Sequence, residues 1–90
     1  MLGNADNNKG NTEAQTVEAL ARIGRTLKAA GYDWSNVVDG IVYITDVKNF
    51  DAMNKGYRTI FTKDFPARAT VRTGLVNADG LTELMFVAAK

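Results

Sequence analysis

The chain has 90 residues, of which 46% are hydrophobic and 23% are charged, a composition suited to one modest globular domain. The net charge of +1 gives no argument for nucleic acid or an acidic membrane surface as a partner. The chain contains neither cysteine nor histidine, which excludes disulfides, thiolate or imidazole metal sites and serine–histidine catalysis. No apolar run reaches the roughly 20 residues of a membrane span, and the N-terminus lacks the apolar core of a signal peptide. We therefore expect a cytoplasmic protein.

The first half of the sequence predicts a loop, a helix and a strand. Residues 1–11 are rich in Asn and Gly without periodicity, which predicts an N-terminal loop. Thr12 followed by Gln15 is typical of a capping box, and an apolar stripe predicts a helix that Gly31 ends in a left-handed conformation. Residues 37–45 are dense in β-branched and aromatic side chains on both faces, which favours a central strand covered on both sides.

A second helix is predicted after this strand. Asp46 or Asn49 is suited to cap it, and the apolar periodicity extends to about Phe61. Asn54 lies on the edge of the apolar stripe, and we expect Tyr57 to belong to the core rather than to a site. The stripe consists of Phe50, Met53, Tyr57, Ile60 and Phe61.

Two strands are predicted to complete the sheet, over residues 67–76 and 81–89, with a turn at 77–80 in which Gly80 is suited to positive φ. Two helices on one face would leave the other face of the sheet apolar and uncovered. Candidates for this uncovered face are Val42, Val71 and Val87. Proteins usually cover such a face by self-association, so the pattern predicts a homo-oligomer or a missing piece of the fold.

Two charged residues interrupt the apolar strands near the C-terminus. Arg68 opens one predicted strand and Glu83 lies within the next, where unpaired charge is costly. An arginine there is able to hold a carboxylate through two parallel N–H bonds, and a glutamate is able to position or deprotonate a water. Together they indicate a small anionic substrate and a hydrolytic step. A structural ion pair between the two, and a plain solvent-facing role for Glu83, remain open as alternatives.

The spacing of Arg68 and Glu83 bears on whether the two side chains of one chain can meet at one site. In a simple hairpin closed at 77–80, Arg68 and Glu83 would be offset by about five residues, or roughly 15 Å along the strands. A meeting across a subunit boundary would resolve this separation, which agrees with the expectation of an oligomer.

A set of short motifs between Glu13 and Lys90 occurs in a specific combination. The motifs are Gln15-Thr16, Leu20, Ala29-Ala30-Gly31, Asn36-Val37-Val38, Tyr43-Ile44-Thr45-Asp46, Phe50, Asn54, Tyr57, Phe61, Phe65-Pro66-Ala67-Arg68 and Glu83. With them the chain resembles the RidA family, also called the YjgF/YER057c/UK114 family. The resemblance implies a chorismate-mutase-like α/β (α+β) fold, with residues 12–90 as a single domain in the order α-β-α-β-β and two helices on one face of one sheet.

The resemblance also implies a function. Family members form homotrimers with ligand sites in the clefts between subunits, and many hydrolyse reactive imines and enamines, such as 2-iminopropanoate, to 2-oxo acids and ammonia without a metal or organic cofactor. By this resemblance Arg68 holds the substrate carboxylate, and Glu83 orients the attacking water and assists proton transfer. Thr70 stands at a pocket position that is often cysteine in the family, and Asn54 matches a helix asparagine near the cleft. We expect no membrane or nucleic-acid partner.

The chain departs from the family pattern at two places. The family domain normally begins with a β-hairpin, a tyrosine and a Ser-Gly-containing strand end, none of which precedes Met1. We therefore expect the chain to correspond to the C-terminal two-thirds of a family domain, with residues 1–11 as the loop that follows the hairpin. Met85 stands where an acidic residue is common, which would reshape the cleft.

Three alternatives to a working deaminase stay open at this point. A module could bind small carboxylates without turnover, as suits a chain without the N-terminal tyrosine. The ribonuclease or translation-inhibitor activity ascribed to the family is a second alternative, against which the nearly neutral charge and the lack of histidine count. A truncated product with no activity is the third.

Overall fold

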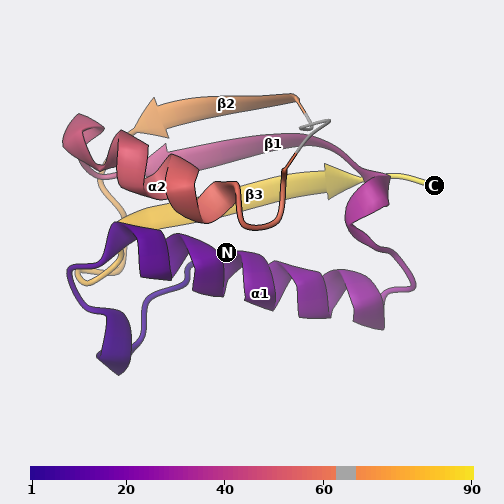
Figure 1. The fold of residues 1–90 in the computed structure, drawn as a ribbon, viewed down its shortest axis with the longest axis horizontal. Coiled ribbons are helices and arrows are strands. Elements are labelled where there is room, and N and C mark those ends of the chain that lie inside the picture. Colours follow the sequence, from indigo (N-terminus) through magenta and orange to yellow (C-terminus); the bar gives the residue numbers. More distant parts are fainter. Residues whose placement is uncertain (63–66) are drawn as a thin grey trace.

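The molecule consists of one three-stranded sheet with both helices on the same side (Figure 1). The structure is a computed structural model that describes residues 1–62 and 67–90. Within these ranges the elements are α1 (Thr12–Ala29), β1 (Val37–Ile44), α2 (Phe50–Tyr57), β2 (Ala67–Arg72) and β3 (Thr82–Ala88), with short 3-10 turns at Asp6–Asn8, Trp34–Asn36 and Val47–Asn49. The predicted α-β-α-β-β order and the α+β fold class are confirmed. The extended Phe65 expected before Pro66 lies outside the described residues.

Strand β1 is the centre of the sheet, in the order β2-β1-β3. Strand β2 pairs with it in parallel and places Arg68 opposite Gly40, while β3 pairs with it in antiparallel and places Glu83 opposite Tyr43. The predicted central position of β1 is confirmed. A simple hairpin between the last two strands is wrong, because β2 and β3 lie on either side of β1 and each pairs with this more apolar strand.

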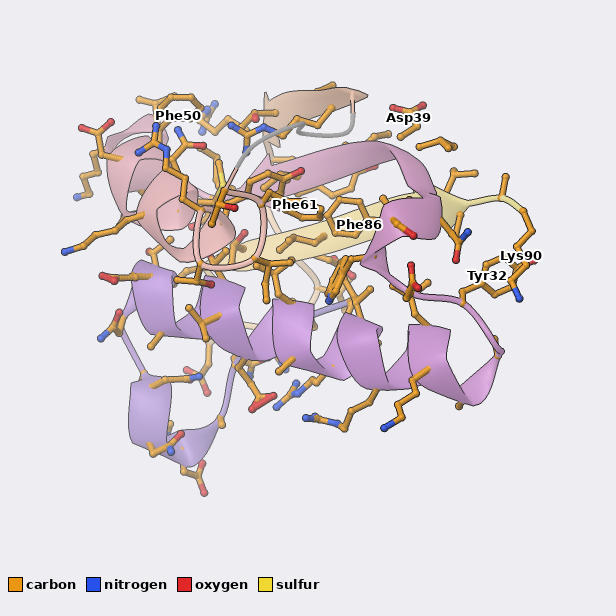
Figure 2. The ribbon with its side chains drawn as sticks, turned by 45° about the vertical axis from the view of Figure 1, so that its right-hand side comes forward. Tyr32, Asp39, Phe50, Phe61, Phe86 and Lys90 are labelled. Carbon is orange, nitrogen blue, oxygen red and sulfur yellow. The ribbon has the colours of Figure 1, made fainter. Side chains whose placement is uncertain are left out.

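The helix-covered face of the sheet carries the core. Leu20 from α1, Met53 from α2 and Leu84 from β3 are completely buried, and burying each such side chain stabilises the fold by about 1.5–3 kcal/mol. Phe61 and Phe86 lie between the sheet and α1 with ring centres 5.7 Å apart (Figure 2). The complete cluster is Ala19, Leu20, Ile23, Val42, Ile44, Met53, Tyr57, Phe61 and Leu84, with Leu27, Trp34 and Phe86 packed against it.

The opposite face of the sheet, which we call the open face, is not covered by any described residue of the chain. Val71 and Val87 are exposed there, as predicted. The assignment of Val42 to this face is wrong, because the helices cover the side of β1 to which it points and leave it 0% exposed. The register shifts between Val37 and Asp39, so Val37 is buried and Val38 is exposed. The predicted cover on both sides of β1 is therefore present on one side only.

The start of α1 differs from the predicted capping box. Asn11 caps this helix, because its side chain accepts the N–H of Ala14 at 2.9 Å, and Thr12 is already the first helical residue. Gln15 is buried and fastens the start of β3 instead: its side-chain N–H donates to Asp79 O at 3.1 Å, and its Oε1 accepts from Leu81 N at 2.8 Å. A buried amide that satisfies backbone groups in this way contributes about 1–3 kcal/mol.

The other predicted turn and helix signals are partly confirmed. Gly31 follows α1 with φ +82°, whereas the described glycines with positive φ do not include Gly80. Asp46 caps the 3-10 turn before α2 by accepting the N–H of Lys48 at 3.0 Å. Helix α2 ends at Tyr57 rather than at the predicted Phe61, because the chain turns immediately after it.

The two helices pack closely at Gly56. A Cβ atom there would lie 2.8 Å from Glu13 O and 2.9 Å from Thr16 Cβ, which leaves no room for a side chain. Beside this contact, Lys55 Nζ lies 3.9 Å from a carboxylate oxygen of Glu13 in an exposed ion pair. The close spacing of α2 and α1 therefore requires a glycine at this position.

The N-terminal residues run along the outer side of β3. Leu2 forms an isolated bridge with Glu83, and Leu84 N donates to Met1 O at 2.9 Å. The side-chain amide of Asn8 donates to Gly3 O at 2.9 Å, which folds this segment back toward α1. In the part of the chain that the structure describes, no helix has the length and apolar character needed to cross a membrane.

Candidate functional site

Arg68 is held against α2 by three different side chains. Its pairing with Gly40 places it on the helix-covered face, where one guanidinium nitrogen donates to Asn54 Oδ1 at 2.5 Å. The other terminal nitrogen lies 3.4 Å from Met53 Sδ, and Cζ lies 4.4 Å from the centre of the Tyr57 ring. The arginine is half-buried. The structure thus brings Arg68 and Asn54 into direct contact.

The described side chains that contact this guanidinium are neutral. Burial raises the pKa of Tyr57, and the positive charge of Arg68 opposes that rise without cancelling it, so the phenol stays protonated at neutral pH. None of the ion pairs found among residues 1–62 and 67–90 includes Arg68. A cation in such a place favours an anion delivered from outside the chain, and a guanidinium is shaped to bind a carboxylate.

Thr70 lies on the same side of the sheet as Arg68. It pairs with Val42, whose side chain is in the core, and it follows Arg68 by two residues along the same strand. Residues i and i+2 of a strand share a face and lie about 7 Å apart. The half-buried Thr70 therefore lies beside Arg68 on the same face of the edge strand β2.

Glu83 lies on the other face. It pairs with Tyr43, and its two neighbours in β3, Thr82 and Leu84, are completely buried among the core residues. Because side chains alternate along a strand, Glu83 points toward the open face, where it is half-buried and has the Met1 amino group 3.7 Å away. The chain by itself thus directs Glu83 away from the helix-covered face.

The distance between the two charged residues follows from the pairing register. Arg68 is opposite Gly40 and Glu83 is opposite Tyr43, three positions further along β1. The backbones of the two residues are therefore separated by about 10 Å along the strands and by about 10 Å across two strand spacings. Their side chains are further apart because they point to opposite faces of the sheet. An ion pair between Arg68 and Glu83 of the same chain, the structural alternative raised by the sequence, does not form.

The linings of two cavities include neither Arg68 nor Glu83. One of about 490 Å³ is formed by the N-terminal segment and α1, and one of about 250 Å³ lies between α1 and β3. Neither is lined by Arg68, Asn54, Thr70 or Glu83. Within the described ranges, no group of three acidic side chains is placed to hold a metal ion. Among the described residues, the candidate site therefore consists of Arg68 and the side chains of α2 that contact it.

Sequence reasoning missed the contact of Met53 and Tyr57 with the arginine. Tyr57 is indeed a core residue, as predicted, but one face of its ring is against Arg68. Asn54 and Tyr57 are three residues apart in α2, a spacing that puts both on one side of a helix. That spacing, beside a strand beginning with an arginine, was the signal available in the sequence.

Solved structures place this fold among known proteins. A member of the YjgF protein family from Neisseria meningitidis superposes with a TM-score of 0.89 at 27% identity, covering 100% of this chain and 74% of that one. A member of the YjgF/YER057c/UK114 family from Mycobacterium tuberculosis superposes with a TM-score of 0.85 at 28% identity, covering 97% of this chain and 71% of that one. The fold is that of the YjgF-type α+β proteins.

The family follows from the sequence profile. Residues 3–90 match the endoribonuclease L-PSP family, and the chain belongs to this family, the RidA or YjgF/YER057c/UK114 family. A relative from Capra hircus named 2-iminobutanoate/2-iminopropanoate deaminase is 36% identical over 81 residues, which are 90% of this chain. The matched region spans 59% of the length of that deaminase.

Proposed function

We propose that this protein hydrolyses small 2-imino and enamino acids to 2-oxo acids and ammonia. The observation that carries the proposal is the half-buried Arg68, which α2 holds with neutral groups and which has no carboxylate partner among the described residues. The name of the deaminase from Capra hircus supports this reaction. A 2-imino acid supplies the carboxylate that such an arginine favours, next to the C=N bond that reacts.

The proposed reaction is an addition followed by an elimination. Arg68 holds the carboxylate, and a water oxygen forms a bond to the imine carbon while Glu83 accepts a proton from that water. Glu83 returns that proton to the nitrogen, which gives a carbon that bears a hydroxyl and an amino group. Glu83 then takes the hydroxyl proton and passes it to the amino nitrogen as the C–N bond breaks, so that ammonia leaves and the oxygen becomes the ketone of the 2-oxo acid. Imine and water thus give 2-oxo acid and ammonia, with no oxidation or reduction. General acid–base assistance of this kind accelerates a reaction by about 10²–10⁴-fold.

The proposal requires more than one copy of the chain. Arg68 and Glu83 are on opposite faces of the sheet, so we propose that Glu83 of a second copy approaches Arg68 in a homotrimer. The exposed apolar residues of the open face support such an assembly, since uncovered sheet faces favour association. Thr70 would flank the substrate on the side of Arg68, where Asn54 contacts the guanidinium.

A deaminase assay tests the reaction. The imine is generated in the cuvette from an amino acid, and release of 2-oxobutanoate is followed with and without the protein. Arg68→Ala and Glu83→Gln should each reduce the acceleration by at least about 10²-fold. Arg72→Ala, on the same strand, and Asp39→Asn, on β1, serve as matched controls and should retain it. Equal loss in the controls, or full activity of Arg68→Ala, would refute the proposed roles.

A subunit-mixing experiment tests the shared site. Inactive Arg68→Ala and Glu83→Gln chains are unfolded together and refolded. If each site takes Arg68 from one copy and Glu83 from another, about one quarter of the sites should regain both residues by random assembly. No recovery in a mixture that light scattering shows to be oligomeric would place both residues in one copy or exclude their cooperation.

One observation favours a second candidate function. The single chain presents Arg68 without Glu83, an arrangement suited to binding a small carboxylate without turnover. Saturable binding of 2-oxobutanoate, with no acceleration of imine hydrolysis at any protein concentration, would support this binding function over the deaminase.

A further inference from the structure

We infer that Tyr57 and Asn54 are positioning residues that fix the plane and the rotation of the Arg68 guanidinium while leaving its charge uncompensated. This inference rests on the proposed function, since it concerns the same site. It assigns Tyr57 a role beyond the core, and it makes Asn54 a residue that acts through Arg68 rather than on the substrate.

Tyr57 sets the plane of the guanidinium. The Cζ atom of Arg68 lies 4.4 Å from the ring centre, within the range of a cation–π contact. The ring itself has little freedom, because it is 2% exposed and packs against Phe61 and Phe86 with centroid distances of 4.6 and 6.3 Å. A fixed aromatic face covers one side of a planar cation and so holds its edge toward an incoming ligand.

Asn54 sets the rotation within that plane. Its Oδ1 accepts from one terminal nitrogen of Arg68, and its side chain is 8% exposed on a helix whose backbone is hydrogen-bonded there, from Arg58 N to Asn54 O at 2.9 Å. A hydrogen bond to a side chain of α2 orients the fork of N–H groups. A guanidinium has five N–H donors, so contacts to Asn54 and Met53 leave donors for a bidentate carboxylate.

The chemistry of the holders matters as much as their geometry. The described side chains in contact with the guanidinium are an amide, a thioether and a phenol ring, which are all neutral. An aspartate at position 54 would hold the arginine more strongly, but it would satisfy the charge that the substrate carboxylate needs. Asparagine thus orients the Arg68 guanidinium without neutralising its positive charge. The oriented cation then favours a planar anion such as a carboxylate.

The first test separates the effect of the Tyr57 aromatic ring on Arg68 from the effect of apolar packing at this position. The complete chain is examined by NMR without ligand, and binding of 2-oxobutanoate is then measured by calorimetry. In the native protein and in Tyr57→Phe, ring current should shift the Arg68 Nε–H signal upfield. In Tyr57→Leu this shift should disappear and the affinity should fall about threefold to tenfold. An unchanged signal and affinity in Tyr57→Leu, or a loss in Tyr57→Phe equal to that in Tyr57→Leu, would overturn the role of Tyr57.

The second test asks whether the residue that contacts Arg68 at position 54 must be neutral for a carboxylate to bind. Asn54→Asp should weaken 2-oxobutanoate binding by about tenfold or more while thermal unfolding stays at or above the native midpoint, because the new carboxylate pairs with Arg68. Asn49→Asp makes the same charge change five residues earlier, at the N-cap of α2, and is the matched control, with native affinity expected. Tight binding by Asn54→Asp would overturn the argument.

The two tests remain informative if the proposed function fails. A native protein that neither binds 2-oxobutanoate nor hydrolyses the imine would refute the function. The Arg68 Nε–H signal of the unliganded protein would still decide whether Tyr57 and Asn54 fix the guanidinium, since Asn54→Ala should broaden it and Tyr57→Leu should move it.

Discussion

The two faces of the sheet carry the two halves of the proposed chemistry under very different conditions. On the helix-covered face, Arg68 is surrounded by side chains that the core holds in place. On the open face, Glu83 is half-buried and has the Met1 amino group 3.7 Å from its carboxylate. One chain therefore holds the residue proposed to bind an anion, whereas the residue proposed for the hydrolytic step would come from a second copy.

This difference teaches that stability and completeness of a site are separate properties. The covered face gains its order from burial within the chain, whereas the open face depends on what lies against it. The following changes break or sharpen the comparison between the faces, from the largest expected effect to the smallest.

Truncating neighbouring residues of β3 compares the faces directly. Leu84→Ala removes a completely buried side chain and should lower the free energy of unfolding by about 2–5 kcal/mol. Met85→Ala, at a half-exposed position of the open face, should cost less than about 1 kcal/mol in dilute solution. Denaturant unfolding measures both. A cost for Met85→Ala that rises with protein concentration would mean that association buries the open face.

Adding a methyl group to each of two helical glycines tests the fit above the covered face. Gly56→Ala should destabilise the protein by about 1–3 kcal/mol, because the new Cβ would lie 2.8 Å from a backbone oxygen of α1. Gly24→Ala is the control, since its Cβ would meet Trp34 at an ordinary 3.4 Å and alanine favours a helix by about 1 kcal/mol. Equal thermal midpoints for the two variants would contradict this account of the helix contact.

Two buried threonines compare a satisfied with an unsatisfied hydroxyl. Thr82 Oγ1 has no hydrogen-bond partner among the described residues, so Thr82→Val should stabilise the fold by about 0.5–1 kcal/mol. Thr16 Oγ1 donates to Thr12 O at 2.8 Å, so Thr16→Val should cost about 1 kcal/mol. Calorimetric unfolding of both variants gives the signs, and a loss of stability in Thr82→Val would show that its hydroxyl has a partner.

The smallest effect is a dependence on alkaline pH. Burial raises the pKa of Tyr57 above its ordinary value of 10.0, so its stabilising contribution is complete below that pH. As pH rises from about 10 through the raised pKa, the unfolded chain loses the proton first and the free energy of unfolding falls. Tyr57→Phe should remove this part of the decline. Unfolding curves of the two proteins between about pH 8 and pH 11 check it, and parallel curves would contradict it.

Much of the fold was predictable because local patterns decide it. The apolar stripe of α1 and the β-branched run of β1 appear where the periodicity places them. The face on which Val42 lies was not predictable, since alternation along a strand does not say which side the helices will cover. The order β2-β1-β3 was equally hidden, because pairing with β1 depends on contacts between residues distant in sequence.

The candidate site shows the same division. The sequence pointed to Arg68, Thr70, Asn54 and Glu83 as residue types, and the first three do lie on one side of the sheet. Their separation from Glu83 was visible only in the register of both outer strands on β1. The hairpin considered from the sequence also placed Arg68 far from Glu83, but along the strands and not on opposite faces of the sheet.

The contact at Gly56 has a consequence for anyone who maps this protein by mutation. A glycine with no polar atom in its side chain sets where α2 sits, and with it the place of Asn54 and Tyr57. In a saturation screen scored only by growth or product, substitutions at Gly56 would rank beside those at Arg68 and would be mistaken for part of the reaction centre. Measuring protein abundance alongside activity would separate the two groups, because replacement of Gly56 should deplete folded molecules, whereas under the proposed function replacement of Arg68 should leave them folded and inactive.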